Sequence, residues 1–169
     1  GIPADAFVVG TVAIIRPVKG IDILLKAALE CADMANVYWV LIGPLHDRAV
    51  ARLARDNRIK DRVRPTGLRK DAKALMSGMD LFVMPSRAEG LCLALMEAMA
   101  QGLCPVISDA GGMKEVVRHG LDGLVVPRED VPALAGAIRL LHADREKMAV
   151  FSESSRNRIA EKFTPDSMA

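Results

Sequence analysis

Residues Asp80–Gly112 read DLFVMPSRAEGLCLALMEAMAQGLCPVISDAGG and contain one complete strand–helix–strand unit. DLFVM and, from residue 104, CPVIS are short, mostly apolar runs that end at proline or at a glycine-rich turn. Such runs are typical of parallel strands that helices cover on both faces. Between them, Leu93–Gln101 has the apolar spacing of a helix. The stretch therefore predicts part of a parallel α/β sheet.

The same alternation continues in both directions along the chain. Further strands are predicted at Phe7–Ile15, Val37–Ile42, Arg62–Arg64 and Gly123–Val126. Helices are predicted at Asp22–Met34, His46–Asn57, Lys70–Met79, Met113–His119, Val131–His142 and Arg145–Phe163, with Asp130 as an N-cap. About six strands with helices between them predict an α/β fold, a doubly wound Rossmann-like domain with a parallel central sheet. No internal repeat or long linker interrupts the order, so residues 1–169 are expected to form a single domain.

Most glycines and unusual polar residues follow the predicted strands. They occupy Arg16–Gly20, Gly43–Asp47, Gly67–Lys70, Ser86–Cys92 and Asp109–Gly112. The carboxyl ends of parallel strands meet at one rim of the sheet, where open α/β folds bind ligands. Glycine and proline also punctuate ordinary loops, so no single segment distinguishes a site from a turn. Their convergence favours a ligand site at this rim.

The composition is that of a water-soluble globular chain. Of the 169 residues, 51% are hydrophobic and 26% are charged, with a net charge of +2. This small charge and the 4% of aromatic residues argue against a nucleic-acid partner. No stretch approaches the roughly 20 apolar residues of a transmembrane segment, and residues 1–20 lack the order of a signal peptide.

Cysteine and histidine usage bears on location and on metal binding. The three cysteines, Cys31, Cys92 and Cys104, are odd in number and form no CxxC pair. This usage indicates a reducing, cytoplasmic compartment. The three histidines are scattered without ligand spacing, so no metal site is predicted.

Two glutamates stand out in the quoted stretch. Glu89 lies in the loop that opens the predicted helix, and Glu97 follows eight positions later within it. The amides near Gly90–Leu93 would be free at the helix N-terminus and suited to a phosphate or oxyanion. Because Glu97 has apolar neighbours, we expect it to be partly buried and to need donors such as sugar hydroxyls. Alternatively, Glu89 only complements the helix dipole and Glu97 pairs with an arginine; the spacing does not separate these interpretations.

A second candidate is Arg16-Pro17-Val18-Lys19-Gly20, after the first strand. Cations at this place suit a diphosphate, and Gly20 allows close approach of the backbone. On its own this pattern is a weak indication, because a lysine near a helix start is usually a solvated side chain. Neither GxGxxG nor GxxxxGK[ST] occurs, so a dinucleotide-binding dehydrogenase and a P-loop ATPase are poorly supported.

These residues carry a resemblance. EGLCLALME at Glu89–Glu97, continued by AMAQGLCPVISDAGGMKEVV, resembles the Glu-x7-Glu region of retaining glycosyltransferases of GT-B architecture, in glycosyltransferase group 1, family 4. VGTVAIIRPVKGIDILLKAA, VLIG, DRVRPTGLRKD, DLFVMPSR and GLDGLVVPRED are similar to other parts of that family, in the same order. The resemblance covers nearly the whole chain.

The resemblance implies half of a GT-B enzyme. Residues 1–169 look like the C-terminal, nucleotide-sugar donor-binding domain, with the N-terminal acceptor-binding domain absent. GIPADAF resembles the family's interdomain linker, and FTPDSMA stops where its final helix would cross back to the other domain. The isolated domain is then expected to fold but to be inactive, and a peripheral membrane association through the missing domain stays open.

The resemblance also implies a role for each matching residue. Glu97 matches the glutamate on the nucleotide ribose, Glu89 the one beside the donor sugar, and Lys19 the lysine on the diphosphate. Backbone groups would face the sugar and phosphates at Gly90, Leu91, Cys92 and Leu93, and would meet the base at Leu68, with Ser86 near the phosphates. The resemblance further implies that no metal or other cofactor is needed. It implies retention of anomeric configuration by front-face attack, in which the leaving diphosphate accepts the acceptor's proton.

The sequence departs from the family at two places. The arginine expected five residues before Lys19 is Ile14, and Arg16, on the same face if residues alternate, is the candidate replacement. The family's Phe-Pro after Glu-Gly is Leu91-Cys92. At a helix start Cys92 could be a thiol of lowered pKa, although a packing role is the simpler interpretation.

The predicted function is therefore the donor-binding domain of a retaining glycosyltransferase that moves a hexose-type sugar from a nucleotide-sugar to a glycan, lipid or small-molecule acceptor. The alternative is a non-catalytic nucleotide or nucleotide-sugar binding module.

Overall fold

The computed structural model describes residues 1–90 and 92–163. Its strands are β1 Phe7–Val12, β2 Val37–Ile42, β3 Val63–Gly67, β4 Leu81–Met84, β5 Cys104–Ser108 and β6 Leu124–Val126. Its α-helices are α1 Ile21–Glu30, α2 Arg48–Leu53, α3 Ala72–Met76, α4 Leu93–Ala100, α5 Met113–Val116, α6 Val131–Ala143 and α7 Arg145–Lys162. Two short 3-10 turns, η1 Pro17–Lys19 and η2 Lys60–Arg62, complete the order.

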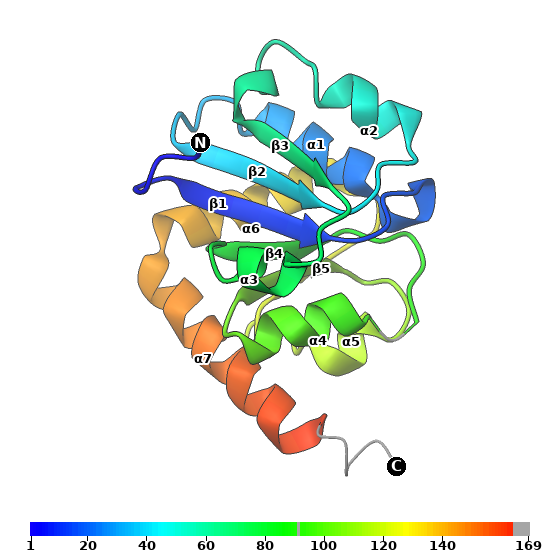
Figure 1. Ribbon diagram of the computed structural model, residues 1–169. Helices are drawn as coiled ribbons and strands as arrows, with labels where there is room; N and C mark the ends of the chain where they lie inside the picture. Colours follow the sequence, from blue (N-terminus) through cyan, green and yellow to red (C-terminus); the bar gives the residue numbers. More distant parts are fainter. Residues whose placement is uncertain (91, 164–169) are drawn as a thin grey trace.

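The strands form one six-stranded parallel sheet in the order β3-β2-β1-β4-β5-β6. Figure 1 shows helices on both faces of the open sheet. The predicted α/β fold, Rossmann-like with a parallel central sheet, is confirmed. The strand order reverses between β1 and β4, and doubly wound folds bind their ligands at such a switch point.

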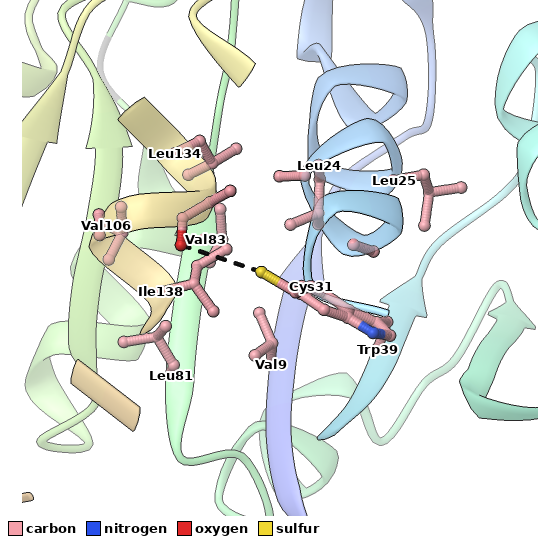
Figure 2. Packing of buried hydrophobic residues seen from close by; sticks show 14 of the residues in the cluster. Val9, Leu24, Leu25, Cys31, Trp39, Leu81, Val83, Val106, Leu134 and Ile138 are labelled. Atoms are coloured by element: carbon pink, nitrogen blue, oxygen red, sulfur yellow. Dashed lines mark hydrogen bonds between the residues drawn. The ribbon is translucent and has the colours of Figure 1, made fainter. Parts of the chain in front are cut away.

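Alternate residues of the strands supply the cores on the two faces. Along β2, Trp39 and Leu41 pack into the core on the α1 and α6 side, whereas Val40 and Ile42 pack on the opposite side, toward α4. Figure 2 shows the first core, with Trp39 and Cys31 beside Val9. The Cys31 thiol points across to α6, where its Sγ lies 3.9 Å from the carbonyl oxygen of Ala135. Helices on both faces therefore cover the sheet beneath the rim loops.

Several predicted boundaries shift. β1 ends at Val12 rather than Ile15, because the chain turns and Ile15 makes only an isolated bridge to Leu45. The predicted strand Arg62–Arg64 is instead Val63–Gly67, and the helices predicted at Asp22–Met34 and Lys70–Met79 are shorter. Asp130 does cap α6, since its side chain accepts a hydrogen bond from the amide of Ala133 at 2.8 Å.

The last helix, α7, packs against α6, β5 and α4, and so spans several layers of the fold. Its Phe151 joins the core on the α1 side, whereas Ile159 packs against the core on the α4 side. In the described residues no helix is both long enough and apolar enough to cross a membrane.

Candidate functional site

A cavity of about 550 Å³ opens at the carboxyl ends of β1 and β4, at the switch point of the sheet. Its lining includes Val12 and Ala13 from the end of β1 and Met84 from the end of β4. Of the residues singled out from the sequence, five line it: Arg16, Lys19, Glu89, Cys92 and Leu93. The topology therefore gathers residues that are far apart in the sequence around one concave site.

An ion pair between Lys19 and Glu89 crosses this site. Lys19 Nζ lies 2.6 Å from Glu89 Oε2, and the two side chains are 24% and 11% exposed. The Ser86 hydroxyl donates a hydrogen bond to the same carboxylate oxygen at 3.1 Å. Ser86 itself is completely buried, and its carbonyl oxygen accepts from the hydroxyl of Ser108. The candidate cation Lys19 and the candidate anion Glu89 are therefore in direct contact, and the buried Ser86 hydrogen-bonds to the same carboxylate.

Two glycines let the site loops approach each other closely. Gly20 has φ 65°, and a Cβ added there would lie 2.0 Å from the carbonyl oxygen of Pro85. Gly111 has φ 49°, and its Cβ would lie 1.7 Å from the carbonyl oxygen of Glu89. Both contacts are with backbone, which cannot move aside as a flexible side chain would. Glycine is therefore required at both positions for the observed position of the Ser86–Gly90 loop.

The N-terminus of α4 faces the same cavity. Cys92 is its N-cap residue, its side chain makes no capping hydrogen bond, and Leu93 is 65% exposed at the rim. Burial raises the pKa of the Cys92 thiol, so the alternative of a thiol with a lowered pKa is wrong and the packing interpretation holds. Gly90 is exposed, and Leu91 lies outside the described residues.

Glu97 differs from expectation. It is exposed, whereas its apolar neighbours suggested partial burial. The physical reason is helical phase: Leu95, Met96 and Met99 turn toward the core, while Glu97 stands one turn after exposed Leu93 on the open face. Its carboxylate is therefore free to meet a ligand and does not line the cavity itself.

The remaining predicted residues lie around the rim. Arg16 is exposed and lines the cavity together with Ile14, so both positions face the same space. Leu68 directly follows β3 and is 80% exposed, away from the cavity lining. Among the described residues, no group of three or more His, Cys, Asp or Glu side chains is placed to hold a metal ion. Donor binding without a metal remains a prediction.

Sequence reasoning missed Arg87, which lies in the site loop and forms a bidentate ion pair with Asp22 of α1. The two residues are far apart in the sequence, and although both lie in stretches that resemble the family, nothing in those stretches indicates that they pair. Only the parallel topology, which brings the ends of β1 and β4 together, could have suggested that their loops meet.

Comparison with known proteins agrees with this geometry. Residues 6–144 match the family model "Glycosyl transferases group 1". The chain belongs to this family. The chain is 35% identical to the lipopolysaccharide core biosynthesis glycosyltransferase LpsD of Rhizobium meliloti (strain 1021), and the match covers 97% of this chain and 48% of LpsD. It is 30% identical to a D-inositol 3-phosphate glycosyltransferase of Thermobispora bispora, over 90% of this chain and 39% of the relative.

A solved structure has a similar fold. Anabaena Alr3699/HepE, in complex with UDP-glucose, matches with a TM-score of 0.83 and 29% identity, over 94% of this chain and 45% of that chain. The chain thus spans less than half the length of each of these proteins.

Proposed function

We propose that the chain is the C-terminal donor-binding domain of a retaining glycosyltransferase, which transfers a hexose-type sugar from a nucleotide-diphosphate sugar to a glycan, lipid or small-molecule acceptor. The observation that carries the proposal is the Lys19–Glu89 pair in the cavity at the switch point of the sheet. The complex of HepE with UDP-glucose supports a nucleotide-sugar as the donor and makes UDP the first probe.

The charges of the site suit departure of a nucleoside diphosphate. As the bond to the sugar breaks, negative charge builds on the leaving diphosphate. Lys19, with Arg16 beside it, and the positive N-terminal end of α4 are placed to stabilise that charge without a metal ion. The leaving diphosphate would accept the acceptor's proton, which is consistent with retention of configuration.

Glu89 and Glu97 have different roles in this proposal. Glu89 is held by Lys19 and Ser86 in the cavity, where it would orient the donor sugar and favour positive charge at its anomeric carbon. Exposed Glu97, outside the cavity lining, would accept hydrogen bonds from the ribose hydroxyls. Backbone near Leu68 would meet the base. Gly20 is buried against the carbonyl oxygen of Pro85. Its part would therefore be to hold the Lys19 turn close to the Ser86–Gly90 loop rather than to admit the phosphates.

The partners and location follow from the same proposal. An N-terminal acceptor-binding domain of the same protein would close over the cavity, since the chain covers only 48% of LpsD. The proposed location is the cytoplasm, where nucleotide-sugars are the donors, with any membrane contact made through the other domain.

Calorimetric titration with uridine, UDP and UDP-glucose tests the assignments, with GDP- and ADP-linked hexoses as the alternative donors. Glu97→Ala should weaken all three ligands by roughly ten- to 150-fold, the value of a hydrogen bond to a charged group, with little change in melting temperature. Lys19→Ala should weaken UDP but not uridine. Glu89→Ala should weaken UDP-glucose relative to UDP. Equal affinities for wild type and Glu97→Ala would overturn the ribose assignment.

Gly111→Ala is expected to damage the sugar subsite. Alanine at φ 49° pays about 1–2 kcal/mol for the left-handed backbone, and its Cβ also displaces the Glu89 carbonyl. Gly120→Ala is the matched control, because Gly120 has φ 74° with nothing within 4 Å of the added Cβ. Both variants should have a lower melting temperature, but only Gly111→Ala should lose affinity for UDP-glucose relative to UDP. An equal loss in both would contradict the assigned contact.

A further inference from the structure

Arg87 connects the two loops that carry Lys19 and Glu89. It lies two residues before Glu89, in the segment between β4 and α4. Its main-chain N–H donates to the carbonyl oxygen of Val18 at 2.8 Å, and its side chain donates to that of Pro17 at 2.5 Å. Both acceptors belong to η1, whose last residue is Lys19. One residue thus binds the turn that ends in the lysine to the loop that holds the glutamate.

The guanidinium group of Arg87 also reaches the first turn of α1. Its two terminal nitrogens donate to the two carboxylate oxygens of Asp22, at 2.8 and 2.9 Å. Asp22 is only 7% exposed. Burial alone would raise the pKa of this carboxyl, but hydrogen bonds from Arg87 and Lys26 outweigh burial and lower it. This planar, two-bond geometry is specific to arginine and is not reproduced by lysine.

The Arg87 side chain also contacts the segment between β6 and α6. Arg87 Nε lies 2.6 Å from Glu129 Oε1. Glu129 has φ 61°, a left-handed conformation that is uncommon for residues other than glycine. Backbone strain of this kind persists where surrounding contacts enforce it, and it gathers at functional sites. The contacts to Asp22, Pro17 and Glu129 occupy N–H groups on all three nitrogens of the guanidinium group.

We infer that Arg87 is a positioning residue for the donor diphosphate. Through Pro17, Val18 and Asp22 it sets where Lys19 stands relative to Glu89, so that both side chains meet one nucleotide-sugar. This inference rests on the proposed function. Arg87 does not need to touch the ligand, because its guanidinium group is already bound to Asp22, Pro17 and Glu129.

The test compares Arg87→Lys and Arg87→Ala with Arg139→Lys and Arg139→Ala. Arg139 is the matched control: it pairs with Asp33 and donates to the carbonyl oxygen of Glu30, at the opposite end of α1. Affinities for UDP and uridine are measured by calorimetry, and melting temperatures by scanning calorimetry. If UDP does not bind the wild type, GDP with guanosine and ADP with adenosine replace the pair.

A small misplacement of a reacting group can cost about a hundredfold in rate, and by the same reasoning Arg87→Ala, which displaces Lys19, should weaken UDP binding by roughly ten- to a hundredfold. Arg87→Lys, which keeps the charge and has the better chance of folding normally, should show part of this loss, and uridine affinity should be unchanged in both. The Arg139 variants should alter neither affinity, and because the Arg139–Asp33 pair is exposed they should change the melting temperature little.

The outcomes separate the two claims. Arg87→Lys that binds UDP as tightly as wild type would overturn the positioning role and leave the proposed function standing. A similar loss of uridine and UDP affinity would also overturn it, because the effect would not be specific to the diphosphate. A wild-type chain that binds none of the three nucleoside diphosphates would overturn the proposed function and this inference together.

Discussion

The purified chain is expected to bind a nucleotide-diphosphate sugar and yet to transfer no sugar at a rate typical of enzymes. The proposed donor site lies open at one rim of the sheet, and the proposed acceptor site belongs to another domain. Holding two reactants in the right geometry contributes about 7–11 kcal/mol to barrier lowering in well-oriented systems, which corresponds to about 10⁵- to 10⁸-fold in rate. Without the proposed acceptor-binding domain, sugar transfer should therefore be close to abolished.

Radiolabelled UDP-, GDP- and ADP-hexoses provide the measurement, with transfer and donor hydrolysis followed separately. Thermal stabilisation by the same donors shows that the site is intact. A longer protein that also contains the proposed acceptor-binding domain is the positive control. Turnover by the chain alone at about 1 s⁻¹ or faster would contradict the expectation. Donor binding without transfer by the longer protein would instead favour the alternative of a non-catalytic nucleotide-sugar module.

The fold was predictable because each strand is encoded locally. β2 and β5 have the predicted bounds, since Gly43-Pro44 and the Asp109–Gly112 turn end their apolar runs abruptly. The predicted strand end was wrong where contacts with other parts of the chain, rather than the local sequence, decide where the strand stops. Nothing in the sequence between Val12 and Ile15 marks the place where the chain leaves the sheet, which depends on pairing with β2 and its following loop.

The meeting of the candidate residues at one rim was predictable from the sequence, but their contacts were not. Short loops after parallel strands share one rim, so Lys19 and Glu89 could be expected to lie near each other. Their direct pairing, and the contact of Arg87 with Asp22, depend on side-chain positions that no periodicity encodes. For Glu97 the sequence held the information, but the prediction of partial burial was wrong. Glu97 follows exposed Leu93 by one helical turn and so lies on the same exposed face, although its nearest neighbours in the sequence are apolar.

Asp122 is a second feature that the sequence did not reveal, and it carries the largest expected effect on stability. Its side chain is completely buried just before β6. Arg118 donates from two guanidinium nitrogens to its two oxygens, at 2.7 Å each, and the Ser154 hydroxyl donates at 2.8 Å. Arg158 Nε lies 3.5 Å away. Because Ser154 and Arg158 belong to α7, Asp122 fastens the last helix to the body of the domain.

Asp122→Ala should leave these donors without their acceptor. Removing one partner of a buried ion pair costs about 3–5 kcal/mol of unfolding free energy, and solvent access to Arg118 favours the lower end, about 3 kcal/mol. For a domain of this size that corresponds to a fall in melting temperature of about 6–12 °C. Asp71→Asn is the control, since Asp71 pairs with Arg69 through two hydrogen bonds but at an exposed position, and its melting temperature should hardly change.

The dependence of stability on acid pH separates the contribution of the Asp122 charge from that of its packing. Burial alone would raise the pKa of Asp122, but hydrogen bonds from Arg118 and Ser154 outweigh burial and lower it. The carboxylate therefore stabilises the fold fully above its unfolded pKa of about 3.9, and that contribution is lost as the pH falls through the lower, folded value. Asp122→Asn keeps the shape without this titration, so its unfolding free energy should fall less steeply with acid than that of wild type. Parallel acid profiles for the two proteins would mean that Asp122 holds α7 by packing rather than by charge.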